Sequence, residues 1–480
     1  MAEERATSGI DLHLEPVRPG GLRRGLTDAL RDAVRTGRLA PGTRLPSSRT
    51  LAADLGIARN TVADAYGDLV AEGWLTARQG SGTRVADRTV VPSAGSAAPR
   101  RREPSRPAYN LVPGTPDLAA FPRAEWLKAA RRALTAAPSH ALDYGDPRGR
   151  PELRTALAAY LSRSRGVRAD PDAIVVCSGF SHGLRILARV LRARGAETVA
   201  VEAYGLDVHW RLLADTGLTT RPLPYDGLGT DPRGLEDAAA VLLTPAHQFP
   251  MGVALHPDRR AAVVDWARRT GGLVLEDDYD GEFRYDRQPV GALQGLDPDH
   301  VVHLGTASKA LAPGLRLAWM VLPPSLVGEV TAAKGGIDTC GVMDQLTLAE
   351  FLTSGAYDRH VRSSRLRYRR RRDALVAELA RRAPAVRATG IAAGLHVVLR
   401  LPPGTERATL RAAAWHGVAV HGLSRYRHPE SATEQPDALV VGYGTPPDHA
   451  WSGALEALCA ALPEQPVVSS ARATPYPAWP

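Results

Sequence analysis

The first part of the chain carries apolar residues at helical spacing, separated by short polar breaks. An apolar side chain recurs every four positions at its start, in Leu22, Leu26, Leu30 and Val34. This spacing predicts an amphipathic helix that runs to about residue 36. Glycines and prolines interrupt the pattern over residues 37–46, and Ser47 is a favourable N-cap for a short second helix that ends at Gly56.

A third helical pattern, ARNTVADAYGDLVAEG, follows a tight turn and ends at Gly73. Four apolar residues are predicted on its buried face: Val62, Tyr66, Leu69 and Val70. Arg59, Asn60 and Thr61 are predicted to be exposed in its first turn, the part of a recognition helix that meets base edges. The segments WLTAR and TRVA, joined by QGSG, then predict a two-stranded hairpin.

A small helical bundle with solvated arginines would show the same spacing. The stretch LPSSRTLAADLGIARNTVADAYGDLVAEGWLTARQGSGTRV, however, closely resembles the winged helix-turn-helix of GntR-type bacterial transcription regulators. The resemblance implies that residues 12–86 form a domain that binds a double-stranded DNA operator. The residues expected to contact bases or phosphates are Arg44, Ser48, Arg49, Arg59, Asn60, Thr61, Arg78, Gly80 and Ser81.

Two segments lack apolar periodicity. Residues 87–107 are rich in Pro, Ser, Ala and Arg, which predicts a flexible linker. Residues 464–480 are rich in proline and are predicted to be disordered. The segments between them, residues 108–463, are predicted to form one large domain.

From residue 173 onward, apolar runs alternate with loops and helical patterns. The runs are AIVVC, TVAVE, AVLLT, GLVLE and HVVHL. Continuous β-branched runs separated in this way predict a parallel sheet with helices on both faces. Ligands bind at the carboxyl ends of the strands in such sheets, so the residues after each run are candidate site residues.

Polar residues suited to binding a ligand follow the first and third runs. After AIVVC, the segment SGFSHGL opens a helix, where Gly179, Phe180 and Ser181 would offer backbone N–H groups and a hydroxyl to an anion. Ordinary helix capping would look the same. After AVLLT, His247 and Gln248 are placed to hydrogen-bond a cofactor oxygen, although any polar turn between two prolines would have a similar sequence.

The fourth run continues as GLVLEDDYDGEFRY. Asp277 and Tyr279 are two positions apart, so they point to the same side if the strand continues. A carboxylate facing a pyridine nitrogen keeps that nitrogen protonated, and a phenol can hold the 3-oxygen of the ring. An acidic metal-binding loop is the alternative, but no Cys/His partner set accompanies these residues, and no metal site is predicted.

The fifth run leads into LGTASKALAPGLRLAWM. A loop of small residues precedes Lys309, and Arg316 follows seven positions later, before another apolar run. A reactive lysine needs a fixed, partly desolvated amine and a cofactor carbonyl to condense with, and an arginine nearby suits a phosphate. The pattern suggests a Schiff-base lysine, although lysines after Gly/Ser loops are also common on surfaces.

Together these strand ends resemble the fold-type I pyridoxal-phosphate enzymes of the aminotransferase kind. By that resemblance Lys309 carries the cofactor, Asp277 pairs with the pyridinium and Tyr279 with the 3-oxygen. His247 or Gln248 would occupy the place of the ring-contacting asparagine of the family. The phosphate would be held by Thr306, Arg316, Gly179, Phe180 and Ser181.

A GntR-type head joined to an aminotransferase-like body resembles the MocR-type regulators. The resemblance implies a winged helix-turn-helix, a large α/β fold-type I domain and a small C-terminal α+β subdomain. The body would sense a small amine or amino acid, or pyridoxal phosphate itself, as in regulators of vitamin B6 synthesis. Tyr144 in YGDPRGRPELR resembles the tyrosine that reaches the phosphate of the partner subunit, which implies a head-to-tail homodimer.

The chain departs from the aminotransferase pattern at two places. The VExPGY segment, whose tyrosine stacks on the cofactor ring, reads VEAYG here, which leaves Tyr204 as the candidate for that role. The arginine that clamps an amino-acid carboxylate is replaced by Val440. Arg425 or Arg427 from a neighbouring loop is a candidate substitute, and without one an α-amino acid is disfavoured as the ligand.

Composition sets outer limits on these interpretations. The length of 480 residues allows two to four domains. The hydrophobic content of 44% is enough for at least one large core. A net charge of +9 permits binding to a polyanion without establishing it. The three cysteines show no CxxC spacing, and the absence of a secretory or membrane-spanning segment predicts a cytoplasmic protein.

Three functions remain open on the sequence alone. The leading hypothesis is a transcription regulator whose effector domain binds pyridoxal phosphate on Lys309. The rival is a catalytically active aminotransferase with an accessory DNA-binding head, which the valine at position 440 disfavours. A binding module without a cofactor would require Lys309 to be an ordinary lysine.

Overall fold

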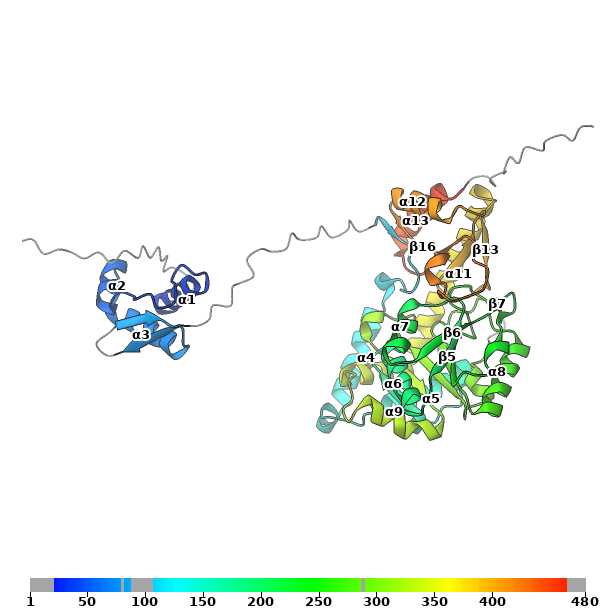
Figure 1. Ribbon diagram of the computed structural model, residues 1–480, viewed down its shortest axis with the longest axis horizontal. Coiled ribbons are helices and arrows are strands. Elements are labelled where there is room, and N and C mark those ends of the chain that lie inside the picture. Colours follow the sequence, from blue (N-terminus) through cyan, green and yellow to red (C-terminus); the bar gives the residue numbers. More distant parts are fainter. Residues whose placement is uncertain (1–20, 79–81, 88–106, 286–289, 464–480) are drawn as a thin grey trace, which may run out of the picture. The chain divides into compact units, whose positions relative to one another are not determined.

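The computed structural model describes residues 21–78, 82–87, 107–285 and 290–463 (Figure 1). The chain divides into two compact units, Met1–Ser105 and Arg106–Pro480, and each is described by itself. The predicted linker (87–107, apart from its two end residues), the tail (464–480) and the turn residues Gly80 and Ser81 lie outside the described residues. The boundaries given for these segments therefore stay predictions.

The described residues of the N-terminal unit form three helices and a hairpin: α1 (Leu22–Arg35), α2 (Ser48–Leu55), α3 (Arg59–Ala71), β1 (Leu75–Arg78) and β2 (Gly82–Val85). Its elements follow the predicted order. Ser47 caps α2 by accepting a hydrogen bond from the Thr50 backbone N–H at 3.1 Å, and Gly56 ends the helix in the left-handed conformation. The two strands pair antiparallel, which confirms the hairpin.

Two residues of the predicted apolar faces are not buried. Leu22 is 48% exposed because it is the first residue of α1 and lies beyond the core that Leu26 and Leu30 enter. Val70 is 36% exposed because one helical step past the buried Leu69 turns the side chain about 100° toward solvent. The prediction of a buried Val70 was therefore wrong.

The C-terminal unit is built on a seven-stranded sheet of order β4-β12-β11-β10-β9-β5-β6. The strands are β4 (Ile174–Cys177), β5 (Thr198–Glu202), β6 (Thr219–Leu223), β9 (Ala240–Leu243), β10 (Leu273–Asp278), β11 (Val301–Thr306) and β12 (Ala318–Val321). β12 runs antiparallel to both of its neighbours, so the sheet is mixed and not parallel as predicted. The connection from β11 to β12, residues 307–317, contains only a single turn of 3₁₀-helix and is too short for the crossover that a parallel neighbour requires.

Helices cover both faces of this sheet. Alternate residues of β4 enter different cores: Val175 and Cys177 pack with α6 (Phe180–Ala193) and α7 (Asp207–Asp215), whereas Ile174 and Val176 pack with α5 (Pro151–Arg165) and α10 (Val342–Thr353). A third cluster joins β9 and β10 to α8 (Pro257–Thr270). The period of two along a strand buried on both faces explains why these runs are continuously apolar.

A C-terminal subdomain lies at one end of this unit, away from α6 and α9 (Val327–Lys334) in Figure 1. It contains the sheet β13-β14-β17-β16 and the helices α12 (Glu406–Trp415) and α13 (Asp448–Ala461). The strand bounds are β13 (Arg387–Thr389), β14 (Val397–Arg400), β16 (His421–Gly422) and β17 (Ala438–Val441). The long helix α11 (Ala356–Arg382) leads into it, and the predicted small α+β subdomain is confirmed. Among the described residues, no helix combines the length and apolarity that crossing a membrane requires.

Candidate functional site

The N-terminal end of α3 carries the predicted base-reading residues. Arg59 and Asn60 are exposed, and Thr61 is half-buried. α3 is held from behind by α1, because the Arg23 guanidinium donates to Asp68 at 2.9 and 2.5 Å and Arg31 donates to Glu72 at 2.9 and 2.8 Å. The first turn of α3 therefore projects from a fixed helix, as major-groove reading requires.

The predicted phosphate contacts surround this helix end. Arg49 and Arg78 are exposed, and Ser48 is half-buried at the start of α2. Tyr66 of α3 donates to the Pro46 carbonyl at 3.0 Å, which ties α3 to the loop before α2. Arg44 forms a β-bridge with Arg84 of the hairpin, and its guanidinium lies against Gly82. Among the predicted contacts that the structure describes, all are on α2, α3, the hairpin or the loop before α2.

In the C-terminal unit, the strand ends enclose a cavity of about 310 Å³. The structure brings eight of the predicted cofactor residues into its wall: Lys309, Asp277, Tyr279, Phe180, Ser181, Thr306, Arg316 and Tyr204. Gly179, His247 and Gln248 lie directly behind this wall, and Tyr144 lies on the exposed surface.

Lys309 lies in the loop that follows β11, three residues after the strand ends. Its Nζ donates a hydrogen bond to the Gly114 carbonyl at 2.5 Å. Burial lowers the pKa of the Lys309 amine, while the nearby Asp277 and Asp280 carboxylates act in the opposite direction. A lowered pKa increases the fraction of neutral amine, which is the form that attacks a carbonyl.

Arg316 and the start of α6 form a site suited to an anion. The Arg316 guanidinium donates to the Ser178 carbonyl at 2.6 Å and lies so close to Gly179 that an added Cβ would be 2.2 Å from its Nη2 atom. Gly179 is therefore required here. Arg316 is the one non-glycine residue with positive φ (53°) in the described part of the chain, and strain of this kind is concentrated at functional sites.

Asp277 faces the cavity from β10, whereas its neighbours Glu276 and Asp278 face the opposite side of the sheet. Its Oδ1 atom is buried and has no hydrogen-bond partner. Burial raises the pKa of the Asp277 carboxyl well above its ordinary value, although the charge of Lys309 counteracts this. A buried acceptor without a donor fits a ligand that brings an N–H group to this position.

Asp278 and Glu276 are fully engaged on the other side of β10. Arg165 donates to Asp278 at 2.6 and 2.9 Å, and the backbone N–H groups of Leu293 and Gln294 donate to Glu276 at 2.6 and 2.9 Å. The alternation of the strand thus separates a structural ion pair from the carboxylate in the cavity wall.

Tyr279 lies just past the end of β10, with its ring in the cavity wall. Its hydroxyl donates to the His247 carbonyl at 3.0 Å and lies 3.1 Å from Nδ1 of His247. His247 therefore contacts Tyr279, not the cavity. The Gln248 amide donates to the Tyr204 and Phe249 carbonyls and accepts from the Met251 N–H, so it holds the loop together.

Tyr204, the candidate for stacking on a ligand ring, is almost completely buried. Its hydroxyl donates to the Glu434 carbonyl at 2.9 Å, and its ring packs edge-on against Tyr225. Four aromatic side chains that sequence reasoning missed also line the cavity: His209, Trp210, Phe249 and His396. The His209 ring centroid lies 4.6 Å from that of Phe180. Burial and the charge of Lys309 lower the pKa of His209 to about 4, so its ring is neutral at pH 7.

Glu202, at the end of β5, is a second buried carboxyl in the wall that sequence reasoning missed. It accepts hydrogen bonds from Thr244 at 2.5 Å and Thr230 at 3.1 Å. Burial raises the pKa of Glu202 from 4.5 to about 7, and the two threonines limit the rise. The apolar run TVAVE could have identified the residue, because a glutamate ending a continuously buried strand is unusual.

Glu202→Gln is expected to flatten the pH dependence of stability. A carboxyl whose pKa is raised on folding contributes full stability below its unfolded pKa of 4.5, and stability falls as the pH rises toward the folded pKa of about 7. The substitution should remove about 1–3 kcal/mol of this fall. Urea unfolding from pH 4.5 to 7.5 measures the free energy of unfolding at each pH, and substitution of the exposed Glu197 by Gln is the control. If this free energy depends on pH in the same way in the unsubstituted chain and both variants, the expectation is contradicted.

No described arginine other than Arg316 lines the cavity. Val440 is fully buried in an apolar cluster with Tyr204, Met251 and Leu423. Arg425 is exposed, and the Arg427 guanidinium donates to the Ser431 and Thr433 carbonyls. The expectation that one of these two arginines replaces the missing clamp therefore finds no support in the geometry.

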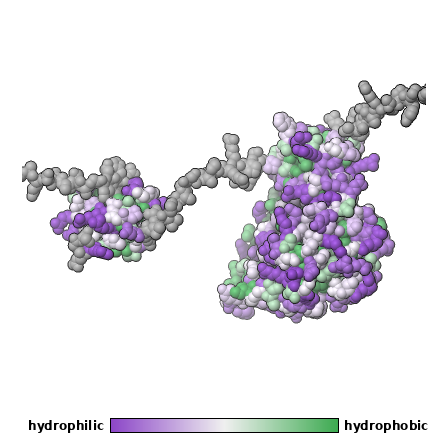
Figure 2. Space-filling view, viewed as in Figure 1, coloured by the Kyte–Doolittle hydropathy of each residue, from purple (hydrophilic) through white to green (hydrophobic). Residues whose placement is uncertain are grey.

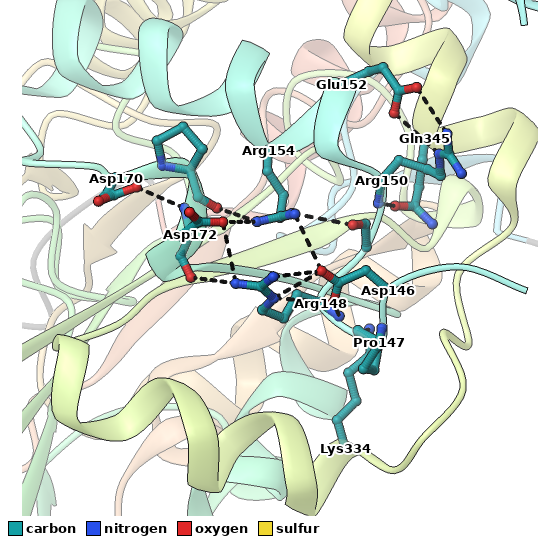
Figure 3. A network of polar contacts seen from close by, with 12 residues as sticks. Asp146, Pro147, Arg148, Arg150, Glu152, Arg154, Asp170, Asp172, Lys334 and Gln345 are labelled. Carbon is teal, nitrogen blue, oxygen red and sulfur yellow. Dashed lines mark hydrogen bonds and ion pairs between the residues drawn. The ribbon is translucent and has the colours of Figure 1, made fainter. Parts of the chain in front are cut away.

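Tyr144 is 84% exposed. The residues that follow it, from Asp146 onward, are held by a network of ion pairs and hydrogen bonds (Figure 3). Asp146 pairs with Arg148 at 2.7 Å and with Arg154 at 3.4 Å, and Asp172 pairs with the same two arginines. Further contacts come from Gln345, which accepts from the Arg150 N–H at 2.8 Å, and from Lys334, which donates to the Pro147 carbonyl. The backbone beside Tyr144 is thus held while its side chain points into solvent.

Two protein-family models match the chain. The family described as aminotransferase class I and II matches residues 110–432, and the family described as bacterial regulatory proteins, gntR family, matches residues 22–85. The chain is 34% identical to the HTH-type pyridoxine biosynthesis transcriptional regulator PdxR of Corynebacterium glutamicum, over 91% of this chain and 95% of that protein. It is also 34% identical to the probable rhizopine catabolism regulatory protein MocR of Rhizobium meliloti, over 84% and 87% of the two chains.

Solved structures similar to the C-terminal unit are aminotransferases. An archaeal alanine:glyoxylate aminotransferase superposes with a TM-score of 0.66 and 25% identity, covering 73% of this chain and 89% of that one. The kynurenine aminotransferase of Pyrococcus horikoshii superposes with a TM-score of 0.65 and 25% identity, covering 75% and 91%. These similarities agree with the fold-type I architecture predicted for this unit.

Proposed function

Because this chain belongs to the gntR-type transcription regulators that carry an aminotransferase class I and II domain, we propose that its C-terminal unit binds pyridoxal phosphate at Lys309 and controls DNA binding. Pyridoxal phosphate supplies an aldehyde that condenses with a lysine amine. The observation that carries the proposal is that Lys309 and Asp277 line the same cavity and that the buried Oδ1 atom of Asp277 has no hydrogen-bond partner.

The residues in the cavity wall fit this cofactor at both of its ends. Arg316 and the N–H groups at the start of α6 suit a phosphate, and the hydroxyls of Thr306 and Ser181 lie in the same wall. Asp277 suits a protonated ring nitrogen, and Tyr279 suits the neighbouring ring oxygen. Phe180, His209 and Phe249 offer apolar or neutral ring faces for the flat body of the cofactor.

The effector of the proposed regulator is pyridoxal phosphate itself or a small amine that reacts with it. An amino acid bound by its carboxylate is disfavoured, because Val440 is buried in an apolar cluster and no second arginine among the described residues lines the cavity. The same observation disfavours the rival function of an active aminotransferase, since its substrates would lose the bidentate contact that orients them.

Titration of the cofactor-free protein with pyridoxal phosphate in a DNA mobility-shift assay tests the proposal. The DNA probe is a duplex from the region upstream of the protein's own gene. A change in affinity or in the footprint is the expected result. Unchanged binding and an unchanged footprint at saturating cofactor would remove the regulatory function.

Replacing the residues at the start of α3 is expected to weaken operator binding strongly. Arg59→Ala and Asn60→Ala should each cost about 1–3 kcal/mol, or roughly 5- to 150-fold in affinity, because each removes a donor suited to a purine edge. Fluorescence anisotropy on the same duplex measures the loss. Arg35→Ala is the matched control, because Arg35 is the last residue of α1 and lies outside the predicted base-reading residues. An equal loss of affinity in that variant would show that the effect is only electrostatic.

We also propose that two copies of the chain associate through the face that carries α4 (Arg123–Ala136). α4 buries only Ala129, and Leu127 (68%) and Leu134 (53%) are exposed on it. Figure 2 shows apolar surface along the edge of this unit where α4 lies. The exposed Tyr144 follows shortly after α4, which supports its proposed contact with the cofactor phosphate of the partner subunit.

A further inference from the structure

The loop after β9 connects the cavity wall to the C-terminal subdomain. Its residue His247 is buried, and the His247 ring stacks on that of Tyr279 with the centroids 6.2 Å apart and the planes at 25°. On the other side, Nδ1 of His247 lies 2.8 Å from Oδ2 of the buried Asp280. His247 thus stands between a tyrosine of the wall and a carboxylate behind it.

The hydrogen-bond chemistry of these three side chains fixes most of their protons. An ionised carboxylate can only accept, so Nδ1 of His247 carries a proton that it directs to Asp280 and, at 3.1 Å, toward the Tyr279 oxygen. The Tyr279 hydroxyl has one proton, which it donates to the His247 carbonyl at 3.0 Å. If a ligand oxygen in the cavity takes that proton, the bond to the His247 carbonyl is lost.

His247 is also clamped by the connection between β13 and β14. An added Cβ at Gly394 would lie 2.3 Å from the His247 ring, and the His396 ring centroid is 5.1 Å from that of His247. The Gly252 carbonyl of the same loop accepts from the Ile391 N–H at 2.6 Å. The His247 ring is thus packed against Gly394 and His396, so a shift of His247 has to be accommodated in the segment that contains Gly394.

The same residues would also suit a metal ion on spacing alone. His247, Asp280 and His396 offer ligand atoms within 4.8 Å of one another. However, Nδ1 of His247 is bonded to Asp280, and Nε2 of His396 is 3.1 Å from the Pro250 carbonyl. The group is therefore assigned to hydrogen bonding.

We propose that His247 and Asp280 are positioning residues that hold Tyr279 for the ligand of the cavity and pass the presence of that ligand to residues 390–394, which lie behind Leu395 and His396 of the cavity wall. This inference rests on the proposed function, because it requires pyridoxal phosphate to occupy the cavity. A donor directed at the phenol oxygen strengthens the hydrogen bond that the phenol itself donates. His247 therefore acts on the ligand through Tyr279 and never touches it.

A double-mutant cycle on the full-length chain tests the positioning role. His247→Gln is expected to weaken pyridoxal phosphate binding about 3- to 10-fold, the range for one neutral hydrogen bond. In the Y279F background the same substitution should change binding less than about 2-fold, because the group through which it acts is absent. Asp280→Asn must show the same dependence on Tyr279, and the exposed His416→Gln should change nothing.

Hydrogen exchange tests the second half of the proposal. Pyridoxal phosphate should change deuterium uptake at residues 390–394 of the original protein, and this change should be absent in Y279F at saturating cofactor, whereas Leu395 and His396 line the cavity and are left out of the comparison. Equal losses of affinity in both backgrounds, or an unchanged uptake in the original protein, would overturn this inference alone. Failure of the unsubstituted chain to bind pyridoxal phosphate at all would overturn the proposed function as well.

Discussion

Lys309→Ala is expected to abolish covalent capture of pyridoxal phosphate while leaving operator binding by the cofactor-free protein intact. The amine is desolvated, its pKa is lowered, and the cavity that surrounds it belongs entirely to the C-terminal unit. The visible absorbance that follows cofactor addition should disappear, and so should the response of DNA binding. Borohydride treatment followed by peptide mass analysis identifies the modified side chain.

Lys128→Ala is the matched control for this experiment. Lys128 is exposed on α4 in the same unit, and the other remaining lysine, Lys334, is buried against Asp338 and the Pro147 carbonyl. Modification at Lys128 in place of Lys309, or an unmodified Lys309 in cofactor-saturated protein, would overturn the sensor function. A generic basic DNA-binding protein would then remain.

Neutralising two adjacent aspartates of β10 is expected to give opposite phenotypes. Asp278→Asn leaves the Arg165 guanidinium buried without its charged partner, which should lower the free energy of unfolding by about 3–5 kcal/mol. Asp277→Asn should not lower it. A buried carboxyl with a raised pKa destabilises the folded state above its unfolded pKa, and the amide removes that cost.

The affinity for the cofactor should respond in the opposite way, with a large loss in Asp277→Asn and little change in Asp278→Asn. Asp277→Asn removes a charged acceptor in the cavity wall, so binding of pyridoxal phosphate should weaken by about 10- to 150-fold. Asp278→Asn should retain affinity as long as the chain is folded. Urea unfolding of the cofactor-free proteins and absorbance titration of the folded ones separate the two effects. A loss of stability in Asp277→Asn would contradict the placement of Asp277 on the cavity face of β10 and of Asp278 on the opposite face.

Local sequence determined much of the fold, and its failures have physical causes. The five β-branched runs became β4, β5, β9, β10 and β11 because strands buried on both faces are continuously apolar. β6 was missed because its sequence, TTRPL, contains an arginine and a proline, which an edge strand tolerates. The direction of β12 was missed because an apolar run carries no information about its orientation.

The candidate site was predictable only where its residues share a segment. Lys309, Thr306 and Arg316 lie within one stretch, and Asp277 and Tyr279 within another, so spacing alone suggested them. The Gly114 carbonyl that accepts from Lys309 is 195 positions away in the chain. His209 reaches the wall from α7, and Phe249 reaches it from the loop after β9. The placement of His247 behind Tyr279 depends on tertiary packing that no local pattern contains.

The ion-pair network beside Tyr144 has a consequence for assembly. The backbone on which this tyrosine stands is already ordered in the single chain by Asp146, Arg148, Arg154 and Asp172. Contact with a second copy would therefore restrict little in this segment beyond the rotation of one phenol side chain, so the conformational entropy lost here on association would be small. In the proposed homodimer, the segment that carries Tyr144 would thus be preorganised for its partner, which lowers the free-energy cost of association.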